Sequence, residues 1–516
     1  MHHEDSASAV AVDRWGNVYV TGGSRGFGDD YDFVTIKYSR KGGKLWERRY
    51  EGPHSDYNDK ANAIAVDASG NVYVTGRSYA GPGSDQSDYL TIKYDAEGIL
   101  QWYAVYNGPA NGNDEAHAIA VDGWGNVYVT GESWGGSDAI YDIVTIKYNS
   151  TGVQQWEKRY NGPGNNTDKA YAIGIDNSGF VYVAGESRGS NYYSDCIVIK
   201  YNPANGDPLW VSRYRENNDA NEFGYALKVD GSGNTYVAGM AWGGGATNFD
   251  YLTVKYNSSG VLQWAQHFNG IGNDRDEARA IAVDGSGNVY VTGRSDRVSD
   301  IDQTDYEYLT IKYNSSGVLQ WRQTYNNNSI PLGKDEASAI AVDRYGYISV
   351  TGRSQNSQDN YDYVTIKYKS ANGAEFWNRR YDATNGDDIA ADLVVDDWGD
   401  VIVTGTSDGG GRNFDYLTIK YTDAIQPNSG GEATKIEILS STIDTKTIIS
   451  STSSGYSFKA PADVSGLRIY NVQGKLICSE KPNNGYFTVK GVPAGIYFLR
   501  FESEYSEADR KFIIVK

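Results

Sequence analysis

One short stretch of sequence occurs eight times along most of this chain, and this repeat restricts the possible folds more than any other feature. A well-preserved copy runs from Val66-Asp67 through Gly70-Asn71-Val72-Tyr73-Val74-Thr75-Gly76. Neighbouring copies lie 53 to 59 residues apart, and their shared aspartates are Asp13, Asp67, Asp122, Asp176, Asp230, Asp284, Asp343 and Asp396. A regular period of this kind is typical of solenoids, propellers and arrays, in which every repeat is one supersecondary unit.

Each copy contains four strand signals. In the second copy they cover residues 63–66, 72–75, 88–94 and 99–102, and Gly, Asn and Asp residues separate them. Alternating apolar residues and β-branched side chains between such turns indicate antiparallel strands. Four antiparallel strands per repeat form one propeller blade. We therefore predict an all-β chain with an eight-bladed β-propeller, and a seven-bladed ring is the alternative.

The fourth strand of a repeat is marked by a tryptophan, and there are seven of these for eight copies. They are Trp46, Trp102, Trp156, Trp210, Trp264, Trp321 and Trp377. The eighth copy leaves the pattern after Tyr421, whereas the chain starts directly at a loop, Glu4 to Ala7, that precedes a first strand elsewhere. Because rings usually close by pairing strands from both chain ends, we expect a three-stranded eighth blade whose outer strand lay upstream of Met1.

The composition changes near the C-terminus. The repeats occupy residues 1–424. We expect residues 425–434 to be a linker, because they include Gln426-Pro427-Asn428-Ser429-Gly430-Gly431. Residues 435–516 contain short apolar strands such as Leu467 to Tyr470, separated by turns such as Pro493-Ala494-Gly495. We predict a small Ig-like β-sandwich for this segment.

Both parts resemble known families. The repeat core Ala-Val-Asp-x-x-Gly-Asn-Val-Tyr-Val-Thr-Gly resembles the SBBP bacterial β-propeller repeat, a family defined by fold. The C-terminal stretches Leu467 to Lys475, Val492 to Leu499 and Lys511 to Lys516 resemble the type A sorting domain of the type IX secretion system. This second resemblance implies a secreted or outer-membrane surface protein that contacts the secretion machinery. It also implies an N-terminal signal peptide, which Met1 to Asp5 do not resemble, so we expect the signal to be missing from this sequence.

The charge of the chain limits its partners. The formal net charge is −19 and the pI is about 4.8. An acidic surface repels phosphate backbones, so no nucleic-acid partner is expected. No apolar run is long enough to span a bilayer, so we do not expect this chain to be an integral membrane protein. We expect a monomer.

The repeated polar and aromatic residues are interpreted as scaffold. Asp67 and its equivalents start turns, because Asp accepts local backbone hydrogen bonds and the following Gly tolerates positive φ. Lys93 and the other third-strand lysines are expected to pair with these aspartates, because buried charges are normally paired. The sequence around the repeated tryptophans is similar to the tryptophan-docking motif of pyrroloquinoline quinone dehydrogenase propellers. This resemblance implies that the indoles pack between blades, at Trp102, Trp156, Trp264 and Trp321. The vicinal cysteines and the calcium site of those enzymes are missing from the sequence, and we expect no cofactor and no metal site.

The sequence identifies no catalytic residues. The three histidines beyond the N-terminus are His54, His117 and His267, and none lies in a nucleophile or zinc motif. The chain has 66 acidic residues, so the paired carboxylates of a glycosidase are harder to exclude, because sequence does not supply their separation.

Loops that differ between repeats are the best candidates for ligand binding, because variable loops on a rigid scaffold usually carry function. The loops after the second strands contain the aromatic residues Phe27, Tyr79, Trp134 and Trp242. These residues could stack on a sugar or contact a protein, and local loop packing is the structural alternative. We therefore predict an extracellular binding module for a glycan or a protein. The alternatives are a carbohydrate-active hydrolase or lyase and a purely structural surface protein.

Overall fold

A computed structural model describes most of the repeat region and the strands that follow it. The described residues are 5–25, 30–52, 58–79, 86–136, 140–217, 219–245, 248–297, 305–327, 332–356, 360–383, 386–408 and 414–423, and from residue 434 onward only the strand backbones are described. The chain divides into two compact units, Met1–Thr418 and Ile419–Lys516.

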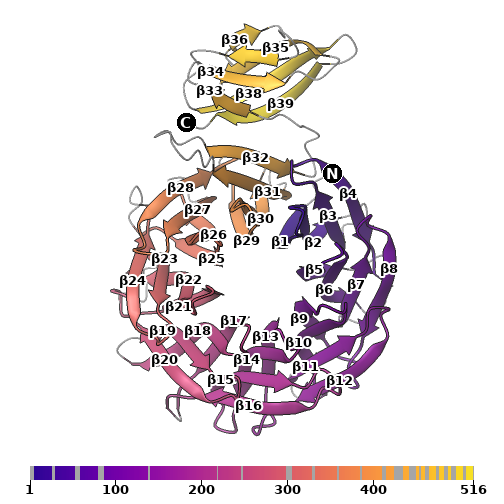
Figure 1. Cartoon of the computed structure of the whole chain (residues 1–516), viewed down its shortest axis with the longest axis vertical. Coiled ribbons are helices and arrows are strands. Elements are labelled where there is room, and N and C mark those ends of the chain that lie inside the picture. Colours follow the sequence, from indigo (N-terminus) through magenta and orange to yellow (C-terminus); the bar gives the residue numbers. More distant parts are fainter. Residues whose placement is uncertain are drawn as a thin grey trace. The chain divides into compact units, whose positions relative to one another are not determined.

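The repeats form eight four-stranded antiparallel sheets (Figure 1). The first four sheets contain β1 (Asp5–Val12), β2 (Val18–Arg25), β3 (Tyr31–Tyr38), β4 (Lys44–Tyr50), β5 (Lys60–Val66), β6 (Val72–Tyr79), β7 (Ser87–Tyr94), β8 (Leu100–Tyr106), β9 (Asp114–Val121), β10 (Val127–Trp134), β11 (Tyr141–Tyr148), β12 (Gln154–Tyr160), β13 (Asp168–Ile175), β14 (Val181–Arg188), β15 (Ser194–Tyr201) and β16 (Pro208–Tyr214).

The other four sheets contain β17 (Glu222–Val229), β18 (Thr235–Gly244), β19 (Asn248–Tyr256), β20 (Leu262–Phe268), β21 (Glu277–Val283), β22 (Val289–Asp296), β23 (Tyr306–Tyr313), β24 (Leu319–Tyr325), β25 (Asp335–Val342), β26 (Tyr347–Gln355), β27 (Tyr361–Lys369), β28 (Glu375–Tyr381), β29 (Asp388–Val395), β30 (Val401–Asp408), β31 (Phe414–Asp423) and β32 (Thr434–Ser440). Within every sheet the strands follow one another in chain order. The chain therefore forms the predicted eight-bladed propeller.

The eighth blade corrects one expectation from the sequence. Its strand order is β29-β30-β31-β32, so the prediction of a three-stranded eighth blade is wrong. The fourth strand is β32, which comes from residues beyond 424 that the sequence analysis placed outside the propeller. The missing tryptophan misled the prediction, because an edge strand pairs through its backbone and needs no particular side chain.

The first strand of each blade lies innermost in the ring and the fourth strand lies outermost (Figure 1). The eighth blade packs against the first without sharing a strand with it. The Val10 backbone N–H donates to Asp392 Oδ2 at 3.0 Å, and the hydroxyls of Ser6 and Thr406 are 2.9 Å apart. Side-chain contacts therefore close the ring.

Six of the blades are held to the next by a tryptophan and a lysine that share one acceptor. In the second blade, Trp102 Nε1 and Lys93 Nζ donate to the Ser150 carbonyl of the third blade at 3.2 and 3.0 Å. The indole also lies against Gly152, where a Cβ atom would come within 2.7 Å of the ring. Six blades repeat this arrangement, with Trp46, Trp102, Trp156, Trp210, Trp264 and Trp321 as indole donors.

The expected lysine–aspartate ion pair occurs at Lys367, whose Nζ lies 3.2 Å from Asp343 Oδ2. Lys367 also donates to the Gly399 carbonyl of the next blade at 3.0 Å. Six other lysines of the described strands donate to a carbonyl of the next blade without forming the ion pair, at Lys37, Lys93, Lys147, Lys200, Lys255 and Lys312. The reason lies in the turn. Asp67 accepts hydrogen bonds from two backbone N–H groups, Asn71 Nδ2 and the Tyr73 hydroxyl, whereas the seventh blade has Tyr347 and Ser349 in the places of Asn71 and Tyr73.

The C-terminal strands form two further antiparallel sheets, β33-β34-β37 and β36-β35-β38-β39. Their strands are β33 (Ile449–Thr452), β34 (Gly455–Lys459), β35 (Val464–Asn471), β36 (Leu476–Glu480), β37 (Tyr486–Val489), β38 (Gly495–Ser503) and β39 (Glu507–Ile514). That these sheets form an Ig-like sandwich stays a prediction. No helix that could cross a membrane occurs in the part of the chain that the structure describes.

Candidate functional site

The antiparallel strand order gives the propeller two different ends. The turns between first and second strands and between third and fourth strands lie at one end, which we call the turn end. The loops between second and third strands and the connections between blades lie at the other, which we call the loop end. The first strands enter the ring wall at the loop end, so their first few residues line the wall there.

Three of the four aromatic residues predicted from the loops take equivalent positions at the loop end. Tyr79 and Trp134 end β6 and β10, and Trp242 lies near the end of β18. All three are partly buried, and the Trp134 ring packs closely on Gly112. Phe27 lies outside the described residues. Ligand binding by these residues stays a prediction.

Trp242 belongs to a series of six rings that the sequence analysis did not recognise. We call it the aromatic track, and all six side chains are partly exposed. Centroid distances between neighbouring rings are 5.2 Å for Trp242–Phe249, 6.1 Å for Phe249–Phe223, 6.0 Å for Phe223–Tyr225, 5.6 Å for Tyr225–Tyr171 and 6.1 Å for Tyr171–His117. The track therefore runs from a loop-end strand across the inner strands of three blades.

The inner part of the track occupies variable positions of an otherwise constant motif. Phe223 is the second residue of β17, and Tyr225, Tyr171 and His117 are the fourth residues of their first strands. In the seventh blade these two positions hold Glu336 and Ser338. The variation within a constant strand was the signal that could have identified these residues.

Charged residues occupy the same wall on both sides of the aromatic track. Glu132 Oε2 lies 2.7 Å from Lys169 Nζ and 3.7 Å from His117 Nε2. On the other side, Glu277 Oε2 lies 3.3 Å from both Arg279 and Arg294. The Glu132–Lys169 pair joins the third and fourth blades and the other pairs lie within one blade, so the wall combines acidic and basic groups that are already matched.

The pairing keeps the Glu132 carboxyl ionised. Burial alone would raise the pKa of Glu132, but the nearby His117 ring and the ion pair with Lys169 hold it below its usual range. Glu132 is therefore suited to accepting hydrogen bonds from a ligand rather than to donating a proton.

A second acid beside the aromatic track is also hydrogen-bonded. The Tyr171 hydroxyl donates to Glu186 Oε1 at 2.6 Å.

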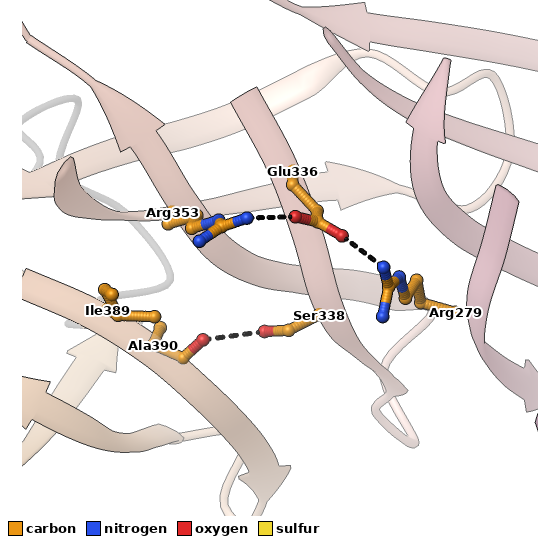
Figure 2. Close-up of a pocket in the computed structure, with 6 residues that line it drawn as sticks. All are labelled: Arg279, Glu336, Ser338, Arg353, Ile389 and Ala390. Atoms are coloured by element: carbon orange, nitrogen blue, oxygen red, sulfur yellow. Dashed lines mark hydrogen bonds and ion pairs between the residues drawn. The ribbon is translucent and has the colours of Figure 1, made fainter. Parts of the chain in front are cut away.

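A cavity of about 360 Å³ opens on the wall of the sixth, seventh and eighth blades (Figure 2). Glu336 bridges Arg279 and Arg353 at 2.8 and 2.7 Å, and Ser338 Oγ donates to the Ala390 carbonyl at 2.9 Å. Ile389 completes the lining. The cavity is small, and Glu336 bridges its two guanidinium groups, of which Arg279 also contacts Glu277 at 3.3 Å.

A second repeated acid, different from the turn aspartate, lies at the start of each first strand. The seven members from the second blade onward are almost fully buried: Asp59, Asp114, Asp168, Glu222, Asp276, Asp335 and Asp388. In the third blade, Asp114 accepts hydrogen bonds from the Gly108 N–H at 2.6 Å and the Trp134 N–H at 3.1 Å. These carboxyls therefore tie the connection between blades to the end of the second strand.

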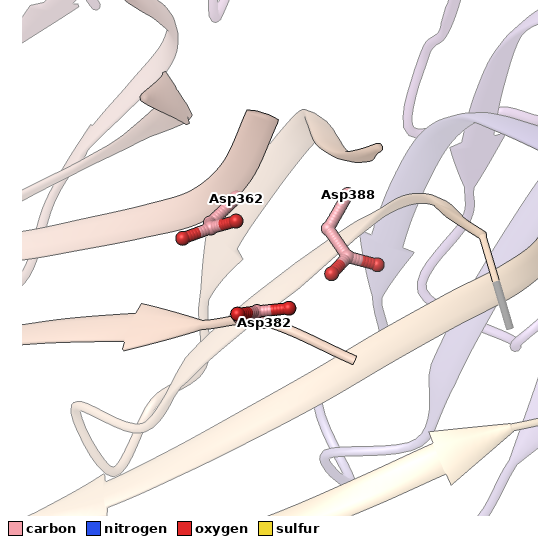
Figure 3. A group of neighbouring side chains, drawn as sticks. All are labelled: Asp362, Asp382 and Asp388. Carbon is pink, nitrogen blue, oxygen red and sulfur yellow. The ribbon is translucent and has the colours of Figure 1, made fainter. Parts of the chain in front are cut away.

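In the eighth blade this buried acid belongs to a group of three carboxyls. One oxygen each of Asp362, Asp382 and Asp388 lies within 4.8 Å of the others (Figure 3). Burial raises the pKa of Asp388 to about 7, and the other two carboxylates add to the shift. Arg380 donates to Asp362. Among the described residues this is the one acidic group compact enough to share a cation, and Arg380 already supplies it with positive charge.

Comparisons with known proteins agree with both sequence resemblances. The family model of the beta-propeller repeat, SBBP, matches residues 48–83, 103–137, 155–193 and 263–297. The model of the secretion system C-terminal sorting domain matches residues 445–515. The chain thus carries both, and the sorting domain marks it for export to the outer-membrane surface or the medium. No curated protein matches the chain.

Solved structures resemble the propeller only distantly. A quinohemoprotein alcohol dehydrogenase from Comamonas testosteroni matches 78% of this chain and 71% of its own at 11% identity, with a TM-score of 0.48. The polysaccharide lyase Uly1 matches 72% of this chain and 90% of its own at 12% identity, with a TM-score of 0.44. The WD40 domain of SCAP from fission yeast matches 81% and 95% at 11% identity, with a TM-score of 0.44. Likenesses this distant carry no argument about function.

Proposed function

We propose that this exported β-propeller protein binds glycans on the inner wall of its ring, at the loop end. The observation that carries the proposal is the aromatic track, in which six partly exposed rings follow one another across three blades. Aromatic side chains combine a flat apolar face with, in Tyr, Trp and His, a polar group for hydrogen bonding. A series of such faces matches the succession of rings in an oligosaccharide.

The polar neighbours of the track support a sugar rather than an apolar ligand. Tyr171 is bonded to Glu186, and the Glu132–Lys169 pair lies beside His117. Hydroxyl groups of a sugar can both donate and accept, so they can join such networks without leaving a buried charge unmatched. A small number of placed polar groups next to apolar faces is the usual composition of a ligand site.

The hydrolase or lyase remains the second candidate, and the local electrostatics favour binding over it. A general acid needs a carboxyl that is protonated near the working pH. Glu132 has a lowered pKa and Glu277 and Glu336 are ion-paired with arginines. The acids whose pKa burial raises to about 7 are almost fully buried and recur in the blades as scaffold, at Asp59, Glu222, Asp276 and Asp388. Asp296, whose pKa is raised to about 6 by burial, and Glu307 are partly exposed and keep the enzyme as a candidate.

The test is a glycan array followed by titration calorimetry on the full chain and on a Tyr171→Ser/Tyr225→Ser variant. Serine already occupies the equivalent position in the seventh blade as Ser338, so the first strands should tolerate it. We expect at least a tenfold loss of affinity, on the order of the 1.4 kcal/mol that a factor of ten represents. Tyr103→Ser, which removes an exposed tyrosine of the outer strand β8, is the control and should bind as the wild type does. Equal affinity in all three proteins would remove the track from the site.

A further inference from the structure

The turn end of the ring carries a second group of aromatic residues, at a position where the repeat does not need them. The third residue of each Asp turn is, in blade order, Trp15, Ser69, Trp124, Ser178, Ser232, Ser286, Tyr345 and Trp398. In every blade the turn uses only the backbone N–H of this residue, which donates to the aspartate Oδ1 at 2.8 to 2.9 Å. Because four blades form the same turn with serine, the turn itself does not require an aromatic side chain.

These four aromatic side chains are exposed. The exposed fractions are 46% for Trp15, 73% for Trp124, 46% for Tyr345 and 37% for Trp398. Each ring lies next to the turn glycine of the following blade: Trp15 by Gly70, Trp124 by Gly179, Tyr345 by Gly399 and Trp398 by Gly16. Exposed large aromatics gathered on one face of a soluble protein commonly mark an interaction site.

Three arginines accompany the rings. The guanidinium carbon lies 4.3 Å from the ring centroid for Arg14 over Trp15, 3.4 Å for Arg40 over Trp398 and 4.9 Å for Arg344 over Tyr345. A stacked guanidinium keeps its in-plane N–H groups available for a carboxylate. Arg344 uses one of them to donate to the Tyr345 hydroxyl at 2.8 Å. Blades 7, 8 and 1 are consecutive around the closed ring, so these six residues form one arc. Trp124 of the third blade lies apart from it, because Ser69 takes this position in the second blade.

We infer that this turn-end arc binds a polysaccharide that bears carboxylates, such as a polymer of uronic acids. The aromatic faces suit sugar rings, and the arginines suit carboxylates, which they bind through paired hydrogen bonds. The inference rests on the three arginines that stack on exposed rings of the arc, in a chain whose net charge is −19. The site lies at the opposite end of the ring from the aromatic track and does not depend on it.

A nucleic acid also offers stacking faces and negative charge, and the structure favours the uronate polymer over it. Nucleic acids carry a charge on every phosphate and require extended positive surfaces. The arc has three arginines, and Asp397 lies in the same turn as Trp398. A polymer with fewer charges and a larger share of apolar ring faces fits this balance better.

The experiment measures retardation of the full chain in affinity gels that contain polygalacturonate, alginate or hyaluronate. Methyl-esterified polygalacturonate, neutral dextran and single-stranded oligo-dT serve as comparison ligands. We expect at least one of the three acidic polymers to retard the protein, and this binding should weaken as salt increases. Binding to the uncharged ligands, methyl-esterified polygalacturonate and dextran, should be at least tenfold weaker. No retardation by any acidic polymer, or equally tight binding to oligo-dT, would overturn the inference.

Two variants locate the site by installing sequences that the repeat already uses. The first, Trp15→Ser/Tyr345→Ser/Trp398→Ser, introduces the serine of the turns in blades 2, 4, 5 and 6. The second, Arg14→Gly/Arg344→Gly, introduces the glycine of blades 5 and 6. We expect each to weaken binding at least tenfold with an unchanged thermal midpoint. Tyr171→Ser/Tyr225→Ser should leave acidic-polymer binding unchanged, and a loss in that variant alone would assign the binding to the channel wall and overturn the inference.

Discussion

At the scale of single residues, the acid at the start of each first strand shows how this fold uses burial. The Asp276 carboxyl accepts hydrogen bonds from the Gly270 N–H at 2.5 Å and the Asp296 N–H at 3.1 Å. Burial nevertheless raises the pKa of Asp59, Glu222, Asp276 and Asp388 to about 7. The hydrogen bonds lower these pKa values but do not offset the loss of water.

These raised pKa values predict how stability changes with pH. A carboxyl with a folded pKa of about 7 and an unfolded pKa of about 4 binds more protons when folded, so the free energy of unfolding falls as pH rises from about 4 to about 7. We expect a higher thermal midpoint at pH 5 than at pH 8. Asp276→Asn should lower the midpoint at both pH values and reduce the difference between them.

The control for this prediction is Asp207→Asn, which removes one negative charge from an exposed side chain. It reports the contribution of the overall negative charge, which also weakens on acidification. If the two variants change the pH difference equally, the effect belongs to net charge and not to the buried carboxyls.

At the scale of blades, the indole and the lysine at each interface act as one unit, because they share an acceptor. Trp102 Nε1 and Lys93 Nζ both reach the Ser150 carbonyl, and the Lys93 ammonium also lies 5.2 Å from the centre of the Tyr73 ring. Burial lowers the pKa of Lys93 and the Asp67 charge opposes this shift. The aspartate therefore acts on the lysine at longer range than in an ion pair.

The shared acceptor predicts that the two residues are not independent. We expect Lys93→Met and Trp102→Phe each to reduce the free energy of unfolding by about 0.5 to 1.5 kcal/mol, the net contribution of a typical hydrogen bond. The double variant should lose more than the sum, because each single variant keeps one donor to the Ser150 carbonyl and the double variant keeps neither. Denaturant unfolding of the four proteins measures this, and Lys93→Met with Trp156→Phe, which uses the Pro203 carbonyl, is the additive control.

At the scale of the whole molecule, the eighth blade depends on a strand that the repeat pattern does not include. β32 is the fourth strand of the eighth sheet and lies just before the sorting domain, which matches from residue 445. Without it, the outer edge of β31 would be unpaired, and unpaired edges promote association between chains.

This arrangement predicts the outcome of shortening the chain. A protein ending at residue 424 should aggregate more readily and melt at a lower temperature than one ending at residue 442, which keeps β32. Light scattering and calorimetry on the two proteins at equal concentration measure the difference. Identical behaviour would mean that β32 contributes nothing to the stability of the propeller.

Much of the architecture was predictable from the sequence, because it depends on local and repeated interactions. The period, the strand alternation and the Asp-x-x-Gly turns led to eight blades, and the two family resemblances agree with the comparisons. The fourth strand of the eighth blade was missed, because backbone pairing leaves no side-chain signature in β32. The lysine partners were missed, because the carbonyl that each lysine reaches belongs to the next blade.

The sequence by itself determined the four-stranded blade, the tryptophan packing between blades and the C-terminal sorting domain. Each of these depends on residues close together in one repeat or domain. The tertiary structure alone decided which of the residues that break the repeat come together. Phe223, Tyr225 and Tyr171 join into one track, and Tyr345, Trp398 and Trp15 into one arc, only because the ring places the same strand or turn position of successive blades side by side. Tyr345 and Trp15 lie at opposite ends of the propeller sequence, and closure of the ring makes them part of one surface.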